Sequence, residues 1–146
     1  MSTEGEYAPS TWAWVADQVA EYEASGGTRA TTLRDTGMPV IIVTTRGHKS
    51  GYVRKFALMR VEHDGVYALV ASKGGAPAHP AWYHNLVADP HVRIQDGPAV
   101  HHYTVREVEG DERELWWSRA VAAYPPYADY AVATSRTIPV LIAERA

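Results

Sequence analysis

The sequence predicts a single α+β domain in which a small antiparallel barrel or sandwich is covered by helices, and three observations support this. Six segments have the short length and apolar pattern of strands, and most of them are joined by hairpin signals. Three other segments repeat apolar residues at helical spacing. The chain has 146 residues, which suits one compact domain, and it contains no internal repeat, low-complexity tract or linker.

The first predicted element is an amphipathic helix after an expected flexible tail at residues 1–9. Ser10 is suited to cap this helix, and Gly26-Gly27 is suited to end it. The polar face of the helix is acidic, which is the wrong sign for anionic lipid, so we expect core packing or a lid. The apolar positions recur every three or four residues and are Trp12, Val15, Val19 and Tyr22.

Residues 39–71 predict three strands. Residues 39–45 are a continuous, largely β-branched run, which is typical of a strand buried on both faces. A turn at residues 46–51 leads into a strand at residues 52–61, where side chains alternate between two faces. The letters EHDG at residues 62–65 are a hairpin signal, and residues 66–71 form the return strand.

The second half of the chain predicts two helices and three strands. A short helix follows Pro80, and strands are expected at residues 91–95 and 100–108. Asp111 and Glu114 resemble a capping box at the start of the next helix. We expect residues 124–130, YPPYADY, to form a loop before a last strand at residues 138–143.

Composition argues against several classes of function. No apolar run approaches the roughly 18 residues of a membrane-spanning helix, so we expect no stable membrane insertion. The chain has no cysteine, which excludes disulfides and thiolate chemistry and fits a cytoplasmic protein, with peripheral attachment to a membrane left open. The net charge of −3 argues against a protein built for nucleic acid.

The seven histidines do not form a recognisable metal motif, and we expect no metal site. His79 and His84 are five residues apart, which places them off one helical face, and His101 and His102 alternate sides of a strand. The sequence also lacks a G-x-S-x-G nucleophile motif and closely spaced carboxylates in its middle part.

Positive charge is concentrated in the middle of this acidic chain. Residues 36–61 contain no acidic residue. They contain five basic side chains, which are Arg46, Lys49, Arg54, Lys55 and Arg60. A small anionic partner would explain such a patch, and a solvated strand face explains it about as well.

A second basic feature lies at the end of the strand at residues 66–71. In Ser72-Lys73-Gly74-Gly75 the glycines expose backbone N–H groups and Lys73 adds a cation, which suits an anion, although a plain glycine turn is equally open. Because these segments lie on adjoining predicted strands, we expect Lys49, Arg54, Lys55 and Lys73 to converge on one phosphate or carboxylate. Arg54 and Lys55 point to opposite faces of a regular strand, so one of the two has room for a structural role in place of binding the anion.

Three tyrosines recur every third residue beside two prolines in the predicted loop at residues 124–130. Tyr124, Tyr127 and Tyr130 would present phenols that stack on a substrate and donate protons. Packing of the loop onto the barrel is the alternative.

Two long stretches resemble the deazaflavin-dependent nitroreductase family, whose members use coenzyme F420. The resemblance extends over about residues 10 to 145, and it rests on ASKGGAPxHPxWYxNL at residues 71–86 and YPPYxxY at residues 124–130, found together and in this order. It implies a split β-barrel with a cofactor groove along the barrel.

The resemblance also implies roles for individual residues. The GxKSGxxR segment and the lysine of ASKGG would hold the phosphate and acidic tail of the cofactor, and the backbone of residues 71–76 would line the rest of the site. The implied cofactor-binding residues are Lys49, Ser50, Gly51, Arg54, Lys55, Ala71, Ser72, Lys73, Gly74, Gly75, Ala76, Trp82 and Asn85. The implied substrate-side, catalytic residues are Tyr124, Tyr127, Tyr130 and Ser72. His48 departs from the arginine or lysine that is common among relatives.

The implied activity is reduction by F420H2 of an electron-poor acceptor, such as a quinone, an enone or unsaturated lactone, or a nitro-heteroaromatic. A deazaflavin passes a hydride, and a tyrosine or water would deliver the proton that follows. Two alternatives stay open, a flavin mononucleotide (FMN) oxidoreductase of the same barrel and a barrel that binds single-stranded nucleic acid. We expect a small-molecule electron acceptor as the partner, and the sequence leaves monomer and dimer both open.

Overall fold

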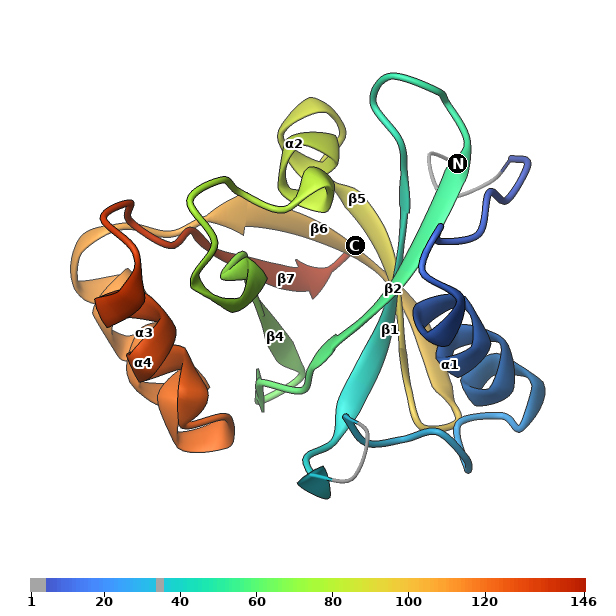
Figure 1. Ribbon diagram of the computed structural model, residues 1–146, viewed down its shortest axis with the longest axis horizontal. Helices are drawn as coiled ribbons and strands as arrows, with labels where there is room; N and C mark the ends of the chain where they lie inside the picture. Colours follow the sequence, from blue (N-terminus) through green and yellow to red (C-terminus); the bar gives the residue numbers. More distant parts are fainter. Residues whose placement is uncertain (1–4, 34–35) are drawn as a thin grey trace.

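The computed structural model describes residues 5–33 and 36–146. In these residues seven strands form one antiparallel sheet that curls into a half-barrel, and four α-helices lie against it (Figure 1). The α+β class and the curled antiparallel sheet of a split barrel, both expected from the sequence, are confirmed.

The strands follow the predicted segments closely, with one addition. The sheet order is β2-β1-β5-β6-β7-β4-β3, and each neighbouring pair is antiparallel. The seventh strand, β3, consists of two residues of the EHDG hairpin, where we expected only a turn. The strands are β1 (Val40–Arg46), β2 (Val53–Met59), β3 (Glu62–His63), β4 (Val66–Val70), β5 (His91–Asp96), β6 (Ala99–Glu107) and β7 (Val140–Arg145).

Strand β1 is buried on both faces, as its continuous apolar run predicted. Ile41 and Val43 belong to a core inside the barrel, which helix α2 (Ala81–Ala88) closes through Leu86. Val40 and Ile42 belong to a second core on the other face of the sheet. That second core is completed by helices α1 (Ala13–Ala24), α3 (Gly110–Ala123) and α4 (Pro126–Ala133).

Two predicted helix starts are wrong in detail. Helix α1 begins at Ala13, and the Ser10 hydroxyl oxygen accepts a hydrogen bond from the Trp12 N–H over 3.2 Å without capping the helix. Helix α3 begins at Gly110 after Glu109, and no side chain caps it, so Asp111 and Glu114 form no capping box. Acidic residues in the first turn still favour α3, because they oppose the positive end of the helix dipole.

The predicted loop at residues 124–130 is wrong, because most of it is helix α4. Tyr124 ends α3, Pro125 makes the turn, and Pro126 is the first residue of α4. A proline is compatible with the first helical position, where its missing N–H has no intrahelical partner to lose. The two prolines therefore start a second helix and do not keep the segment irregular.

The N-terminal segment and α1 are tied to the sheet at two places. Of the expected tail, residues 1–4 lie outside the described residues, and Glu6 to Ala8 pair with Val53 at the edge of β2. The Tyr22 hydroxyl oxygen at the end of α1 accepts a hydrogen bond from the Gly97 N–H over 2.7 Å. Among the described residues, no helix has both the length and the apolar character needed to span a bilayer.

Gly27 makes the second of these ties possible. Its φ is +78°, and a Cβ on it would lie 2.0 Å from the carbonyl oxygen of Gly97. We expect Gly27→Ala to lower the free energy of unfolding by about 2 kcal/mol or more, because a methyl group there overlaps fixed backbone. Urea unfolding followed by tryptophan fluorescence measures this loss.

Gly26→Ala is the matched control, since Gly26 also has a positive φ, +65°, but no atom lies within 4 Å of its Cβ position. It should lose only the strain of a left-handed alanine, about 1 kcal/mol. Equal losses in both variants would show that contact with Gly97 is not what requires glycine at position 27.

Candidate functional site

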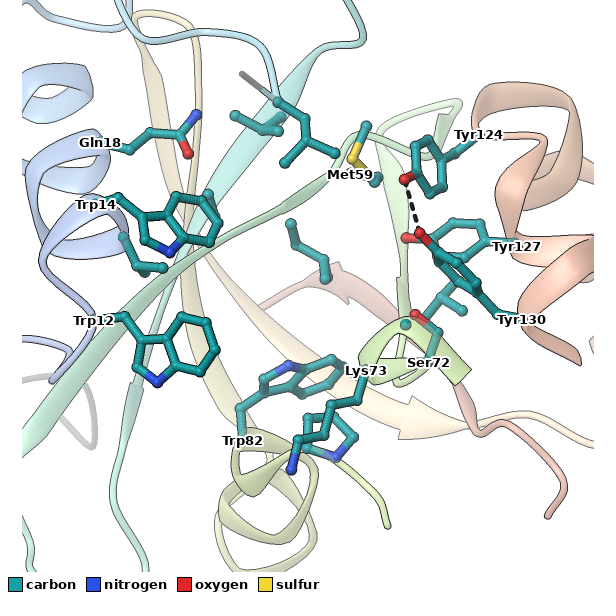
Figure 2. Close-up of a pocket in the computed structure, with 18 residues that line it drawn as sticks. Trp12, Trp14, Gln18, Met59, Ser72, Lys73, Trp82, Tyr124, Tyr127 and Tyr130 are labelled. Carbon is teal, nitrogen blue, oxygen red and sulfur yellow. Dashed lines mark hydrogen bonds between the residues drawn. The ribbon is translucent and has the colours of Figure 1, made fainter. Parts of the chain in front are cut away.

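A pocket of about 590 Å³ lies between α1 on one side and the tyrosine-bearing ends of α3 and α4 on the other (Figure 2). The loop after β4 and the start of α2 complete its wall. Pockets of about 300–1,000 Å³ are typical of small-molecule sites. The strands contribute an apolar surface that consists of Val40, Ala57, Leu58, Met59 and Val70.

The start of helix α1 contributes two tryptophans to the pocket, Trp14 within the helix and Trp12 just before it. Trp12 and Trp14 are 66% and 40% exposed, and Figure 2 shows their rings on the side of the pocket opposite the tyrosines. Gln18 fixes this wall to the next segment, because its side-chain amide donates to the carbonyl oxygens of Ala30 and Thr32. The α1 wall is therefore aromatic and partly open to solvent.

Three tyrosines form the facing wall. The hydroxyl oxygens of Tyr124 and Tyr130 are 3.0 Å apart and share a hydrogen bond (Figure 2). The Tyr127 ring is buried and meets the Tyr124 ring edge to face, with 4.9 Å between centroids. Burial, followed by the bond to Tyr130, raises the pKa of Tyr124 to about 12, and burial also raises the pKa of Tyr127. Both phenols stay protonated at neutral pH and are hydrogen-bond donors.

The loop after β4 has an unusual backbone conformation. Lys73, Gly74 and Gly75 form the short 3₁₀ turn η2 (Lys73–Gly75), and their φ angles are 47°, 64° and 82°. Glycine adopts such angles freely, whereas a lysine there costs about 1 kcal/mol or more. The turn packs directly on α4, because a Cβ on Gly75 would lie 3.1 Å from the carbonyl oxygen of Tyr130. Ser72, Lys73 and Gly74 consequently line the pocket beside the tyrosines.

Helix α2 supplies Trp82 to the pocket and holds the turn at residues 47–50. The Trp82 ring stacks on Phe56 of β2, with 5.1 Å between centroids and planes 13° apart. The buried Asn85 accepts a hydrogen bond at Oδ1 from the His48 backbone N–H over 3.0 Å, and its Oδ1 is also 2.6 Å from His48 Nδ1. Asn85 thus connects α2 to the turn that carries Lys49.

The predicted cationic residues do not all reach the pocket. Among the described residues that line it, Lys73 is the one with a cationic side chain, and Lys49, Ser50 and Gly51 lie in the exposed turn after β1. The Arg54 guanidinium donates to the carbonyl oxygens of Ala8 and Pro9. Lys55 Nζ lies 2.9 Å from Glu23 of α1 in an ion pair. Convergence of all four cations on one anion remains a prediction.

Sequence reasoning missed one residue that organises the site, Arg136. Its guanidinium group donates to the carbonyl oxygens of Ala71, Ser72 and Ala76, so it lies behind the loop that carries Lys73. Arg136 is 60 to 65 positions away from the loop residues that it contacts and belongs to no local motif. Trp14 and Met59 also line the pocket, although no sequence motif marked them as site residues.

Within the described part of the chain, no group of three or more histidine, aspartate or glutamate side chains is arranged to hold a metal ion. The titratable groups of the pocket are instead Lys73 and the phenols, which are suited to bind and orient an organic ligand.

Comparison with known proteins gives consistent matches. A family model described as F420H2-dependent quinone reductase matches residues 14–145. An F420H2-dependent quinone reductase of Mycobacterium tuberculosis is 36% identical over 110 residues, which are 73% of this chain and 74% of that protein. The solved structure of an F420-H2 dependent reductase, FDR-A, has a TM-score of 0.69 and 57% identity, and covers 73% of this chain and 94% of its own. A structure described as a domain-swapped dimer has a TM-score of 0.72 and 50% identity, and covers 92% of this chain and 100% of its own.

The bond between Asn85 and His48 generates a prediction. We expect Asn85→Leu to lower the free energy of unfolding by about 1 kcal/mol or more, because the His48 N–H loses its acceptor. Asn85→Asp keeps an oxygen at that position and should lose less. Urea unfolding at neutral pH compares the two variants, and an equal loss in both would contradict a role for the Oδ1 acceptor.

Proposed function

The chain belongs to the family of F420H2-dependent quinone reductases, and we propose that the pocket described above holds reduced F420 beside an electron-poor acceptor. The protein is an F420H2-dependent oxidoreductase, and F420 is its cofactor. One observation carries the assignment to this pocket. Ser72 and Lys73 meet the Tyr124, Tyr127 and Tyr130 group around one cavity, although the two groups lie far apart in the sequence.

The loop at residues 71–76 has the features that an anionic cofactor requires. Lys73 provides a cation at the pocket, and no atom lies within 4 Å of the Cβ position of Gly74, so a ligand has room to approach the bare backbone. Backbone N–H groups in such turns are suited to bind anions and ring carbonyls. We assign Ala71 to Ala76 to the cofactor, with Lys73 as the residue that fixes its negative charge.

The remaining cofactor contacts follow from the packing around Trp82. Its stack on Phe56 holds the indole ring in place, and Asn85 on the same helix holds the turn that carries Lys49, Ser50 and Gly51. We assign this turn and Arg54 to the outer part of the acidic tail. Lys55 is assigned a structural part in the site, because Glu23 already neutralises it.

When bound, reduced F420 supplies a hydride and avoids one-electron chemistry. The chain contributes position and electrostatics. The tryptophans and tyrosines form two facing aromatic walls, which are suited to hold a flat ring between them. Alignment of this kind provides much of the rate acceleration in reactions that need no acid-base triad.

The acceptor faces Ser72 and the three tyrosines in this proposal. An acceptor oxygen that gains negative charge is stabilised by preorganised hydroxyl donors. Tyr130 is half-buried, and its hydroxyl shares a hydrogen bond with that of Tyr124, so the two phenols form a pair from which one proton is delivered to the product. The apolar strand surface favours a flat, neutral acceptor. A quinone is the first candidate, and enones, unsaturated lactones and nitro-heteroaromatics share this chemistry. We place the reaction in the cytoplasm, in keeping with a chain that has no cysteine.

Replacement of Lys73 tests the cofactor assignment. We expect Lys73→Ala to raise the Kd for F420 about tenfold or more, since a charge-assisted bond to an anion contributes about 1.5–3 kcal/mol. Turnover at saturating cofactor should change much less. Fluorescence titration with F420 gives the Kd.

Arg29→Ala removes the same unit charge from an exposed ion pair with Glu21 and serves as the control, with an expected change below about twofold. An unchanged Kd in Lys73→Ala would remove Lys73 from the cofactor site.

Replacement of Tyr130 tests the acceptor side. We expect Tyr130→Phe to lower kcat by about tenfold or more, because a positioned proton donor contributes roughly 10²–10⁴-fold, while the Kd for F420 stays within about twofold. Stopped-flow oxidation of F420H2 with a quinone and an enone measures kcat. Tyr52→Phe alters an exposed tyrosine outside the pocket and should leave both constants unchanged. A normal kcat with every acceptor would exclude Tyr130 from the proton transfer.

A further inference from the structure

We propose that Arg136 is the positioning residue of the cofactor site, because its guanidinium group closes the base of the loop at residues 71–76 and so presents Lys73 to the pocket. The proposal rests on the proposed function in one respect, which is that this loop binds F420. Arg136 is not among the residues that line the pocket, and its hydrogen bonds to the loop and to His79 place it behind the loop.

The guanidinium group connects both ends of the loop. Its Nε donates to the carbonyl oxygen of Ala76 over 2.9 Å. One terminal nitrogen donates to the carbonyl oxygens of Ser72 over 2.7 Å and Ala71 over 3.2 Å. Because the guanidinium is planar and rigid, these bonds set the separation between the start and the end of the loop.

The loop needs such support, because its own bonds are few. Two backbone hydrogen bonds are formed within it, from Gly75 to the Ser72 oxygen and from Ala76 to the Lys73 oxygen. Lys73 has a left-handed φ of 47°, and Gly74 has open space on its outer side. Strained residues persist where their surroundings determine them from several sides. Here Tyr130 backs the turn at Gly75, and Arg136 fixes the two ends.

His79 completes the arrangement. The second terminal nitrogen of Arg136 lies 2.8 Å from His79 Nδ1, and since arginine is always a donor, Nδ1 is the acceptor and the imidazole proton lies on Nε2. The His79 ring also meets Tyr83, with 4.7 Å between centroids, and His84, with 6.1 Å. Glu107 faces the same cluster and accepts a hydrogen bond from the Tyr83 hydroxyl over 2.6 Å.

This geometry makes the loop sensitive to acid. Burial, then the charge of Arg136 and that of His84, lower the pKa of His79 from its ordinary 6.5, and Glu107 opposes them weakly. A lowered pKa in the folded state means that the unfolded chain binds the proton more tightly. The stability that the neutral His79 and its bond to Arg136 give to the folded state is therefore complete above about pH 6.5. It declines as the pH falls below that value.

Two measurements test the inference, and the first needs no cofactor. The chain has three lysines, Lys49, Lys55 and Lys73, so a lysine-specific protease reports on three places at once. Lys49 lies in an exposed turn and serves as the internal reference, and Lys55 in β2 reports unfolding of the sheet. In Arg136→Met, which keeps the apolar stem but removes the donors, we expect cleavage after Lys73 to increase at least tenfold relative to Lys49. Cleavage after Lys55 should stay unchanged.

The second measurement is the Kd for F420, which we expect to increase at least tenfold in Arg136→Met. Arg136→Lys keeps the charge without the planar fork, and its Kd should lie between those of Arg136→Met and the unaltered protein. Arg113→Met is the matched control, because Arg113 is also half-buried and donates to a backbone carbonyl, that of Ile138, outside the loop. It should leave the Kd and the Lys73 cleavage within twofold.

A third variant tests the link to His79. Asparagine offers an acceptor oxygen near the position of Nδ1 but does not titrate, so His79→Asn should bind F420 normally at pH 7.5. Between pH 7.5 and 5.5 we expect the Kd of the unaltered protein to rise at least threefold more than that of His79→Asn. Protonation of F420 itself affects both proteins alike and cancels in this ratio.

The outcomes separate the inference from the proposed function. Unchanged Lys73 cleavage and an unchanged Kd in Arg136→Met would overturn the inference, and so would a parallel increase at Lys55, which would show that Arg136 supports the whole fold. Faster Lys73 cleavage together with a higher Kd confirms it. If Lys73 cleavage increases but neither Arg136→Met nor Lys73→Ala alters the Kd, the loop is held by Arg136 but does not bind F420, which overturns the positioning role and the assignment of the cofactor to this loop.

Discussion

The pocket depends on one close contact, in which the turn from Lys73 to Gly75 packs against the backbone of α4. Gly75 lets the two backbones approach so closely that a Cβ would lie 3.1 Å from the Tyr130 carbonyl oxygen. The turn continues from β4, and α4 continues from α3, so this contact joins the cationic side of the pocket to its phenolic side. Backbone packing, and not the reach of flexible side chains, therefore sets the distance between the two groups. Hydride transfer tolerates little displacement of the reacting atoms, so a fixed contact of this kind suits the reaction proposed for the pocket.

The sheet determines which walls of the pocket are rigid. Strand β4 lies between β7 and β3, and residues 67–70 are buried on both faces, so the turn that follows begins from a fixed point. Helix α1 is held differently. Its last turn is anchored through Tyr22 and Gly97, and Gln18 ties its middle to residues 30–32, whereas the exposed Trp12 and Trp14 lie at its start. The turn that carries Lys73 thus begins from a fixed strand, and the two tryptophans lie at the more exposed end of α1.

Sequence patterns predicted the parts of this structure that depend on near neighbours. The β-branched run at residues 39–45 predicted a strand buried on both faces, and the strand, glycine and lysine order around Lys73 predicted a turn suited to an anion. The prolines before Tyr127 led to the wrong prediction of a loop. Proline disrupts the interior of a helix but is favoured at its first position, where Pro126 begins α4. The pairs Lys55 with Glu23 and Arg136 with the loop could not be predicted, since both join segments whose proximity is decided by the folded sheet. For this reason the sequence revealed neither the ion pair of Lys55 nor the position of Arg136.

The distribution of charge in the pocket suits the anionic cofactor and the neutral acceptor that we propose for it. Lys55 is neutralised by Glu23, and the Arg136 guanidinium is directed at backbone carbonyls, which leaves Lys73 as the cation of the lining. A single cation in the lining favours the binding of a negative group beside it. In the proposed arrangement the acceptor faces the phenols, and the pKa of Tyr124, raised to about 12, keeps that group a neutral donor. A neutral donor binds an uncharged acceptor weakly and binds it more strongly as negative charge develops on its oxygen. This hydrogen bond is therefore stronger in the transition state than in the ground state, and such a difference accelerates a reaction.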